Sequence, residues 1–230
     1  MSRPRPEPKI SNDDVLVHVE VPPRPRKEPR QARSIALVGA LKQTGRWILE
    51  KEGRHALTPL RLAESAGVAL SSVYEYFPNM DALIAAIFDD LRVAVREEFA
   101  SGLAALPEDA TLYDGIHFSV RLGLAAHYQR MRLDPDYSVR STHFDELVRL
   151  DLVKTKRLWT ACMTPALMQR FAAEVRVKDK RKAEFMVYQT LLALTRSMVL
   201  ERPGYLKDED SSVLIARMVH ALLTTPETAE

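Results

Sequence analysis

The residues of this 230-residue chain best suited to catalysis or metal binding are six histidines and one cysteine, Cys162. No two histidines form an HxxxH or HExxH pair, the spacing that turns two imidazoles toward one metal ion. The cluster His143, Asp145 and Glu146 could hold a metal ion, but such clusters are usually ordinary surface. Neither a glycine-rich phosphate loop nor a Gly-x-Ser-x-Gly elbow is present. We therefore expect no enzyme, no metal ion and no cofactor.

Composition indicates an ordinary soluble globular protein, with 46% hydrophobic and 28% charged residues. No run of about eighteen apolar residues could span a membrane. The basic, proline-rich start lacks the apolar centre of a secretory signal. A single cysteine permits no intramolecular disulfide, which is compatible with a reducing compartment. We expect a cytoplasmic protein that does not engage the membrane.

Charge is unevenly distributed along the chain. Residues 1–78 carry 13 Lys and Arg against 9 Asp and Glu, whereas the remainder carries 20 against 22. A mildly basic N-terminal third on a near-neutral body suits a protein that binds DNA phosphates. A solvated basic tail explains the same charge equally well.

Prolines divide the chain into a tail and a helical part. Seven of the fourteen prolines lie within residues 1–29, and such a segment is predicted to be disordered. From residue 30 onward prolines separate stretches of helix formers, and β-hairpin signals are absent. The sequence therefore predicts an all-α fold, with helices near 31–52, 58–66, 70–76, 80–105, 110–132, 136–163, 166–175, 180–202 and 209–224.

The segment from Thr58 to Pro78 has the pattern of a helix-turn-helix. Thr58 can cap a helix whose first position is Pro59. Gly67 follows where a C-terminal cap needs a positive φ, and a second short helix runs to Tyr76. Two short helices joined at a glycine, with small residues at their contact, predict a helix-turn-helix domain over residues 30–79.

The second of these helices would lie in the major groove of DNA. Serine hydroxyls can contact bases or phosphates, a leucine can contact a thymine methyl, and tyrosine hydroxyls commonly reach phosphates. We expect one face of each tyrosine to be exposed there. The candidate DNA-binding residues are Thr58, Leu70, Ser71, Ser72, Tyr74, Tyr76, Arg30 and Arg33.

Several fixed spacings in this region resemble the DNA-binding signature of the TetR family of transcriptional regulators. They are Leu62-Ala63, Ala66-Gly67-Val68, Val73-Tyr74-x-Tyr76-Phe77-Pro78 and Ala82-Leu83. The similarity covers roughly residues 29–90 and implies an N-terminal three-helix DNA-binding domain. Beyond that point only the general layout is similar, with a variable helical region over 80–230 whose last two helices dimerise.

Two positions depart from the family pattern. Met80 occupies a position where the family usually has a phosphate-binding lysine, and Ala69 replaces a frequent serine cap. Arginines of the tail at 24, 26, 30 and 33, with Lys27, could compensate by reaching phosphates or the minor groove. The alternative is a TetR-like helical dimer that binds a ligand or a protein but has lost specific DNA binding.

The last predicted helix is apolar over more than one stripe, which suits packing both within a subunit and against a partner. By the resemblance, the last two helices imply a homodimer that binds a palindromic DNA operator. A purely intramolecular core is the alternative. The candidate dimerisation residues are Phe185, Leu192, Met198, Leu214, Met218 and Leu222.

A cavity for a small-molecule effector is expected within residues 110–200, among long helices that can part around a ligand. Each of the lining residues named below is, taken individually, more typical of an ordinary hydrophobic core than of a ligand contact. The expected mode is a repressor that the ligand releases from DNA, because the ligand binds the released form more tightly. The candidate lining residues are Tyr113, His117, Arg121, His127, Tyr128, Phe144, Trp159, Met163, Met168, Phe171 and Tyr188.

Overall fold

The computed structural model describes residues 25–26, 29–141 and 163–226. The predictions for Phe144, Trp159, Cys162, the cluster at 143–146 and most of the N-terminal tail lie outside these residues. In the described part the protein is all-helical and contains no strand, as predicted. The elements are α1 Ala32–Lys51, η1 Arg54–Ala56, α2 Pro59–Ala66, α3 Leu70–Tyr76, α4 Met80–Ala105, α5 Leu112–Leu133, α7 Met163–Arg170, α8 Lys180–Glu201, η3 Pro203–Lys207 and α9 Glu209–Thr224.

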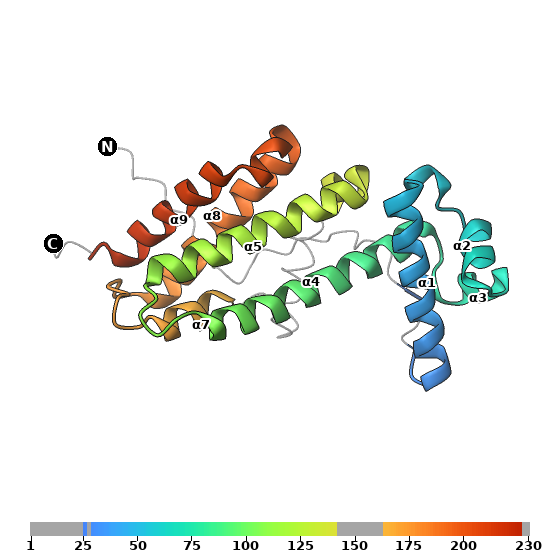
Figure 1. The fold of residues 1–230 in the computed structure, drawn as a ribbon, viewed down its shortest axis with the longest axis horizontal. Coiled ribbons are helices and arrows are strands. Elements are labelled where there is room, and N and C mark those ends of the chain that lie inside the picture. The colour runs from blue at the N-terminus through green and yellow to red at the C-terminus, as the bar shows by residue number, and fades with distance from the viewer. Residues whose placement is uncertain (1–24, 27–28, 142–162, 227–230) are drawn as a thin grey trace, which may run out of the picture.

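The helices form two groups joined by α4 (Figure 1). Helices α1, α2 and α3 gather at the N-terminal end of α4 and, with its first turns, form a unit that we call the head. Helix α5 lies between α4 and the pair α8–α9, and α7 contacts α4, α5 and α8. We call this second group the body. Residues 135–141, directly after α5, are also helical.

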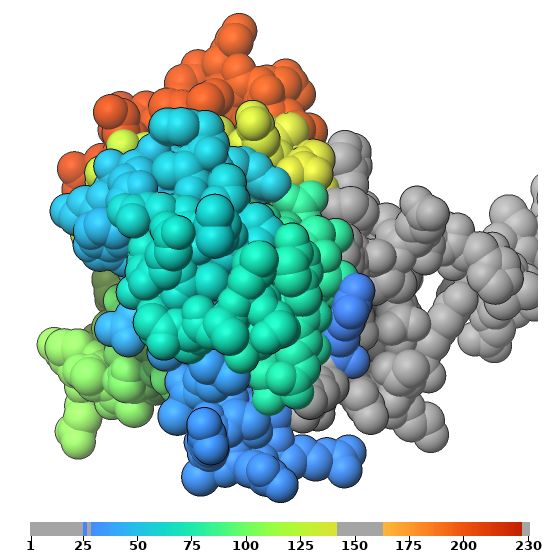
Figure 2. All heavy atoms as spheres, turned by 90° about the vertical axis from the view of Figure 1, so that its right-hand side faces the viewer, coloured from blue at the N-terminus to red at the C-terminus, as the bar shows by residue number. Residues whose placement is uncertain are grey.

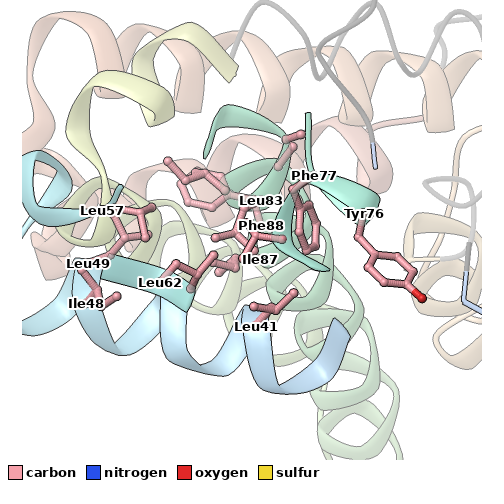
Figure 3. Close-up of a cluster of buried hydrophobic side chains, with 14 of the residues drawn as sticks. Leu41, Ile48, Leu49, Leu57, Leu62, Tyr76, Phe77, Leu83, Ile87 and Phe88 are labelled. Carbon is pink, nitrogen blue, oxygen red and sulfur yellow. The ribbon is translucent and has the colours of Figure 1, made fainter. Parts of the chain in front are cut away.

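The head is held by a hydrophobic core to which each of its helices contributes (Figure 3). Helix α1 buries Leu41 and Ile48, α2 buries Leu62, and α4 buries Leu83 and Phe88. At Gly45 of α1 an added Cβ would lie 2.8 Å from a methyl of Leu83, so glycine permits the close approach of α1 and α4. Leu133 and Tyr137, from the end of α5 and beyond, complete this core.

The body has its own core, formed by the second half of α4 with α5, α7, α8 and α9. Gly115 of α5 lies against α7, where an added Cβ would lie 2.4 Å from the Phe171 ring. Phe99 of α4 and Ile116 of α5 are buried together with Ile215 and Val219 of α9. The two cores therefore meet along α4, between Leu91 in the first and Phe99 in the second.

Helix α7 is displaced from its predicted bounds of 166–175. It runs from Met163 to Arg170, and a turn follows. The Arg170 guanidinium donates to the carbonyls of Leu103 and Leu106 at the end of α4, and the carboxylate of Glu174 accepts from the backbone N–H of Leu112. These long-range contacts fix the turn, and local helix propensity gives no sign of them.

An ion-pair network joins the head to the end of α5. Arg54, directly after α1, donates to Asp81 in the first turn of α4 and to Asp134, with 2.6 Å between Arg54 Nη1 and Asp134 Oδ2. Arg140 Nη1 donates to Asp81 Oδ2 at 3.0 Å. Asp134 is only 1% exposed, and its other oxygen accepts from the backbone N–H of Tyr137 at 2.9 Å. We call Arg54, Asp81, Asp134 and Arg140 the Arg54 network.

The Arg54 network is expected to make stability depend on pH. Burial alone would raise the pKa of the Asp81 carboxyl, but hydrogen bonds from Arg54 and Arg140 outweigh burial and hold this pKa below its usual range. A lowered folded-state pKa stabilises the protein above the unfolded-state value of about 4, and this stability is lost as the pH falls through the folded-state pKa.

Asp81→Asn should therefore lower the free energy of unfolding at pH 7 by about 1 kcal/mol, a value that allows for solvent screening of a partly exposed carboxylate. The deficit should shrink at about pH 3.5, where an Asp carboxyl of the unfolded chain is already more than half protonated, as measured by urea denaturation. The control is Asp90→Asn, which breaks the more exposed ion pair between Lys42 and Asp90. This substitution should lower the free energy of unfolding by less. An equal deficit at both pH values would contradict this account.

Candidate nucleic-acid interface and ligand cavity

Local contacts stabilise both ends of α2, including the turn that leads into α3. The Thr58 side chain accepts from the backbone N–H of Arg61 at 3.1 Å, and Pro59 follows at the first helical position. Gly67 has φ 66° and ψ 35°, a left-handed conformation that favours glycine. The backbone N–H of Val68 then donates to the Ala63 carbonyl at 3.0 Å. These contacts fix the angle at which α3 leaves α2.

Helix α3 presents one face to solvent at the end of the molecule, where α2 and α3 come to the front (Figure 2). Leu70 is 40% exposed and Tyr74 43%, Ser71 is exposed, and Ser72 is half-buried. Val73, on the opposite side, is fully buried in the head core. We call Leu70, Ser71, Ser72 and Tyr74 the reading face. It combines hydroxyl groups with one aliphatic side chain.

Tyr76 differs from the sequence-based expectation of an exposed face. Its side chain is only 4% exposed and belongs to the head core, because α3 turns this position inward. Its ring lies at the edge of the cluster, with the hydroxyl directed away from the other labelled side chains (Figure 3). Its backbone carbonyl accepts from the N–H of Arg26 at 2.8 Å, so Tyr76 links the tail to the end of α3.

Positive charge near the reading face comes from outside α3. Helix α3 contains no Lys or Arg and ends with Glu75 and Tyr76. On α2, Arg61 is paired with Glu52 at 2.6 Å, and the hydrogen bond from Arg61 lowers the pKa of that carboxyl. Arg26, Arg30 and Arg33 are exposed, and the hydrogen bond from Arg26 to Tyr76 places the tail beside α3 (Figure 2). Basic groups for phosphate contact therefore lie on the tail and the start of α1.

Met80 is the first residue of α4, where it is half-buried against the head core. The cap of this helix is intact, since the Asn79 side chain accepts from the backbone N–H of Ala82 at 2.9 Å. Ala69, before α3, provides no side-chain cap. Both departures noted in the sequence thus remove polar groups at helix starts without disturbing the packing.

A cavity of about 260 Å³ opens within the body, between α4, α5, α7, α8 and α9. Most of its lining is apolar, from Phe99 and Val120 to Ile215 and Val219. The lining also includes three arginines and one histidine, namely Arg92, Arg96, His127 and Arg130.

The cavity contains only part of the predicted ligand set. Met163, Tyr188 and His127 line it. Arg121 is exposed on α5, and Phe171 and Met168 are buried in the body core without lining the cavity. The remaining described candidates, Tyr113, His117 and Tyr128, are half-buried and also lie outside the lining.

His117 has a partner elsewhere in the body. Its Nε2 lies 3.0 Å from Ser212 Oγ of α9, and its ring stacks on Tyr113. The contributions of α4 and α9 to the cavity lie outside the range of 110–200 expected from the sequence. One signal was available. Arg92 and Arg96 interrupt the apolar stripe of Leu91, Val95 and Phe99 at helical spacing.

The last two long helices leave apolar side chains in solvent. Phe185 of α8 is 58% exposed and Leu214 of α9 is 64% exposed, and Met218 is exposed on the same helix. The other predicted dimerisation residues are half-buried. Of these, Leu192 lines the cavity, and Met198 and Leu222 pack against the body core.

The described residues contain neither a membrane-spanning helix nor a cluster of metal ligands. No helix among them is long and apolar enough to cross a membrane. Likewise, no three His, Cys, Asp or Glu side chains of the described segments come together as a metal site.

Comparison with known proteins supports the resemblance seen in the sequence. Residues 44–87 match the family described as bacterial regulatory proteins, tetR family. No curated protein matches the sequence. Among solved structures, a TetR-family transcriptional regulator of Mesorhizobium loti MAFF303099 superposes with a TM-score of 0.59 at 14% identity, covering 85% of this chain and 100% of that one. A TetR transcriptional regulator of Rhodococcus sp. RHA1 gives 0.53 at 17% identity, covering 86% and 100%.

The matched residues 44–87 contain α2, α3 and the Gly67 turn, so family and geometry identify the same segment. The two structural similarities extend over most of the chain and establish the fold of the body as well. A segment of the head thus matches the tetR family of bacterial regulatory proteins, and the chain has the overall fold of the two TetR-family structures.

Proposed function

We propose that this protein is a homodimeric transcriptional repressor, without enzymatic activity, that binds a palindromic operator and releases it when a small molecule occupies the body cavity. The reading face carries this proposal. It is an exposed, hydroxyl-bearing surface on the second helix of a tetR-family domain, and that helix enters the major groove in helix-turn-helix proteins. The cytoplasm, where DNA is accessible, is the corresponding location.

Within the reading face, the side chains divide into two roles. Ser71, Ser72 and Leu70 lie in the first turn of α3 and are placed to contact base edges. Tyr74, one turn later, is placed to reach phosphate. Thr58 is occupied in capping α2, so we assign it to orienting the domain, and Tyr76 to holding α3 against the core.

The tail supplies the charge that α3 lacks. Arg26 is held beside α3 through the Tyr76 carbonyl, and Arg30 and Arg33 are exposed just before and in the first turn of α1. We propose that these arginines contact phosphate or the minor groove and take over the role of the missing lysine at Met80.

Dimerisation would use the exposed apolar side chains of α8 and α9. Large apolar side chains left in solvent on two adjacent helices are candidates for an interaction site. A two-fold axis that relates these helices to those of a second subunit would present the two reading faces to successive major grooves, roughly 34–36 Å apart. Leu192, Met198 and Leu222 would support this surface from behind.

Helices α4 and α5 offer a route from cavity to head, because both line the cavity and both reach the Arg54 network. Arg130 lines the cavity, and its carbonyl accepts from the backbone N–H of Asp134 at 3.0 Å. Asp134 in turn accepts from Arg54 of the head. A ligand that moves α5 relative to α4 would therefore change the angle of the head, and release requires tighter ligand binding by that second state.

A second candidate function has one observation in its favour. Helix α3 carries no basic residue and Met80 replaces the family's lysine, as expected for a TetR-like dimer that binds a ligand or protein but no longer a specific DNA sequence. The two candidates differ in whether DNA binding survives a competitor.

The test is a gel-shift titration on DNA from upstream of the protein's own gene, with excess non-specific competitor. The wild-type protein should give a discrete shift, and the double variant Ser72→Ala, Tyr74→Ala should abolish it, since specific sites are typically bound about 10³-fold or more tightly than other DNA. Circular dichroism and dimerisation should be unchanged. The matched control is Ser101→Ala with Tyr205→Ala, two exposed positions of the body. Wild-type binding that competitor abolishes would favour the second candidate.

Met80→Lys should strengthen DNA binding. A lysine at the start of α4 adds one phosphate contact, which steepens the dependence of log affinity on log salt by about 0.9. Gel shifts at several salt concentrations measure this slope. Ala104→Lys adds the same charge at the exposed far end of α4 and should leave the slope unchanged. Equal effects of the two lysines would mean that Met80 does not face DNA.

The double variant Leu214→Lys, Met218→Lys should convert the dimer to a monomer, because it places two charges in an apolar interface. Sedimentation velocity would show the change in mass, and operator affinity should fall by about 100-fold once the two heads are no longer linked. Val93→Lys introduces a charge at an exposed apolar position of α4 and is the control. A double variant that remains dimeric would place the interface elsewhere.

A further inference from the structure

We propose that the body cavity binds an organic anion with an apolar chain, whose negatively charged group lies at the arginine-lined end nearest the head. This inference rests on the proposed function only in taking the cavity as the effector site. It adds the chemical class of the ligand.

The apolar part of the ligand is indicated by most of the lining. Phe99, Val120, Leu124, Ile215 and Val219 surround the space with aliphatic and aromatic carbon. A polar molecule there would lose its hydrogen bonds to water without replacement. The volume of about 260 Å³ is close to the lower end of typical ligand cavities, roughly 300–1,000 Å³. A single small chain or ring fits this space.

The charged part is indicated by four nitrogen-bearing side chains at one end. Arg92 and Arg96 are four residues apart on α4, and His127 and Arg130 are three apart on α5, so each pair shares a helix face. Among the residues of α4 and α5 that line the cavity, these four lie toward the head. No Asp or Glu is among the described residues that line the cavity.

Contacts with neighbouring side chains hold these groups in place. Arg130 is only 7% exposed, and its Nη2 lies 2.9 Å from His127 Nδ1. Arg92 is anchored at its outer side by Asp89, which is largely exposed. A guanidinium has five N–H donors, so each of these arginines can keep its present partners and still donate to a ligand carboxylate.

The electrostatics of His127 agree with an anion site. Burial, followed by the charges of Arg130 and Arg92, holds the pKa of His127 well below its usual value. The imidazole is therefore neutral at pH 7 and can accept from Arg130. The positive charges of Arg130 and Arg92 repel a further cation at this place and attract an anion. A cationic ligand would be excluded.

Isothermal titration calorimetry on the full-length protein tests the proposal. The probes are octanoate, decanoate and dodecanoate, each beside the alcohol of the same chain length, with decyltrimethylammonium as the cation. We expect the carboxylates to bind at least about tenfold more tightly than their alcohols, the gain of one charge-assisted hydrogen bond, and the cation not to bind.

Arg96→Gln and Arg92→Gln should each weaken carboxylate binding by about tenfold and leave alcohol binding unchanged, which shows that the cavity is intact. Either variant suffices if the other does not fold. Arg121→Gln, an exposed position of α5 outside the lining, is the control and should bind as the wild type does. Equal binding of carboxylates and alcohols, or full carboxylate affinity in both arginine variants, would overturn the proposal.

A gel shift with and without decanoate separates this inference from the proposed function. Carboxylate binding that depends on the arginines, with unchanged operator affinity, would support the anion site and contradict its role as effector site. Conversely, a specific DNA shift in a protein that binds none of the carboxylates would support the DNA-binding function and overturn the anion site.

Discussion

Helix α4 has to serve two hydrophobic cores at once, and the rest of the structure depends on this constraint. Its 26 residues span about 39 Å at 1.5 Å per residue. The first turns bury Leu83, Ile87 and Phe88 in the head, and the later turns bury Phe99 and Leu103 in the body. A rigid element shared by two cores transmits displacement between them, because neither core can deform without loss of packing. The orientation of the reading face is thereby tied to the body.

The Arg54 network adds a second, polar connection between the same two units. A buried carboxylate such as Asp134 is costly unless it is paired, and Arg54 is the partner that reaches it from the head. Because Asp81 belongs to α4 and Asp134 follows α5, the Arg54 guanidinium connects two of the helices that line the cavity. The packing along α4 resists bending, whereas the ion pairs depend on short, directional contacts. A small shift of α5 would therefore act first on the Arg54 network.

The local rules of the sequence predicted the head well and the body only in outline. Three residues, Thr58, Pro59 and Gly67, each determine a helix end through neighbouring backbone groups, so their roles could be inferred without the structure. The end of α7 could not, because it depends on Arg170 and Glu174 reaching residues more than sixty positions away. Tyr76 shows the same limit. Helical periodicity gave its place on α3, but its burial depends on how α3 packs within the head.

The cavity shows why ligand residues resist inference from residue type. Aromatic and methionine side chains serve cores and cavities equally, and Phe171 proved to fill the space beside Gly115. Arginine in an apolar stripe is more informative, because placing a guanidinium among apolar side chains is unfavourable unless it has an anionic or hydrogen-bonding partner. Arg92 and Arg96 interrupt such a stripe in the sequence of α4. That they line the same cavity as Arg130 of α5 is evident only from the structure. That meeting point adjoins the Arg54 network through Asp134, so the charged end of a bound anion would lie where α5 is connected to the head.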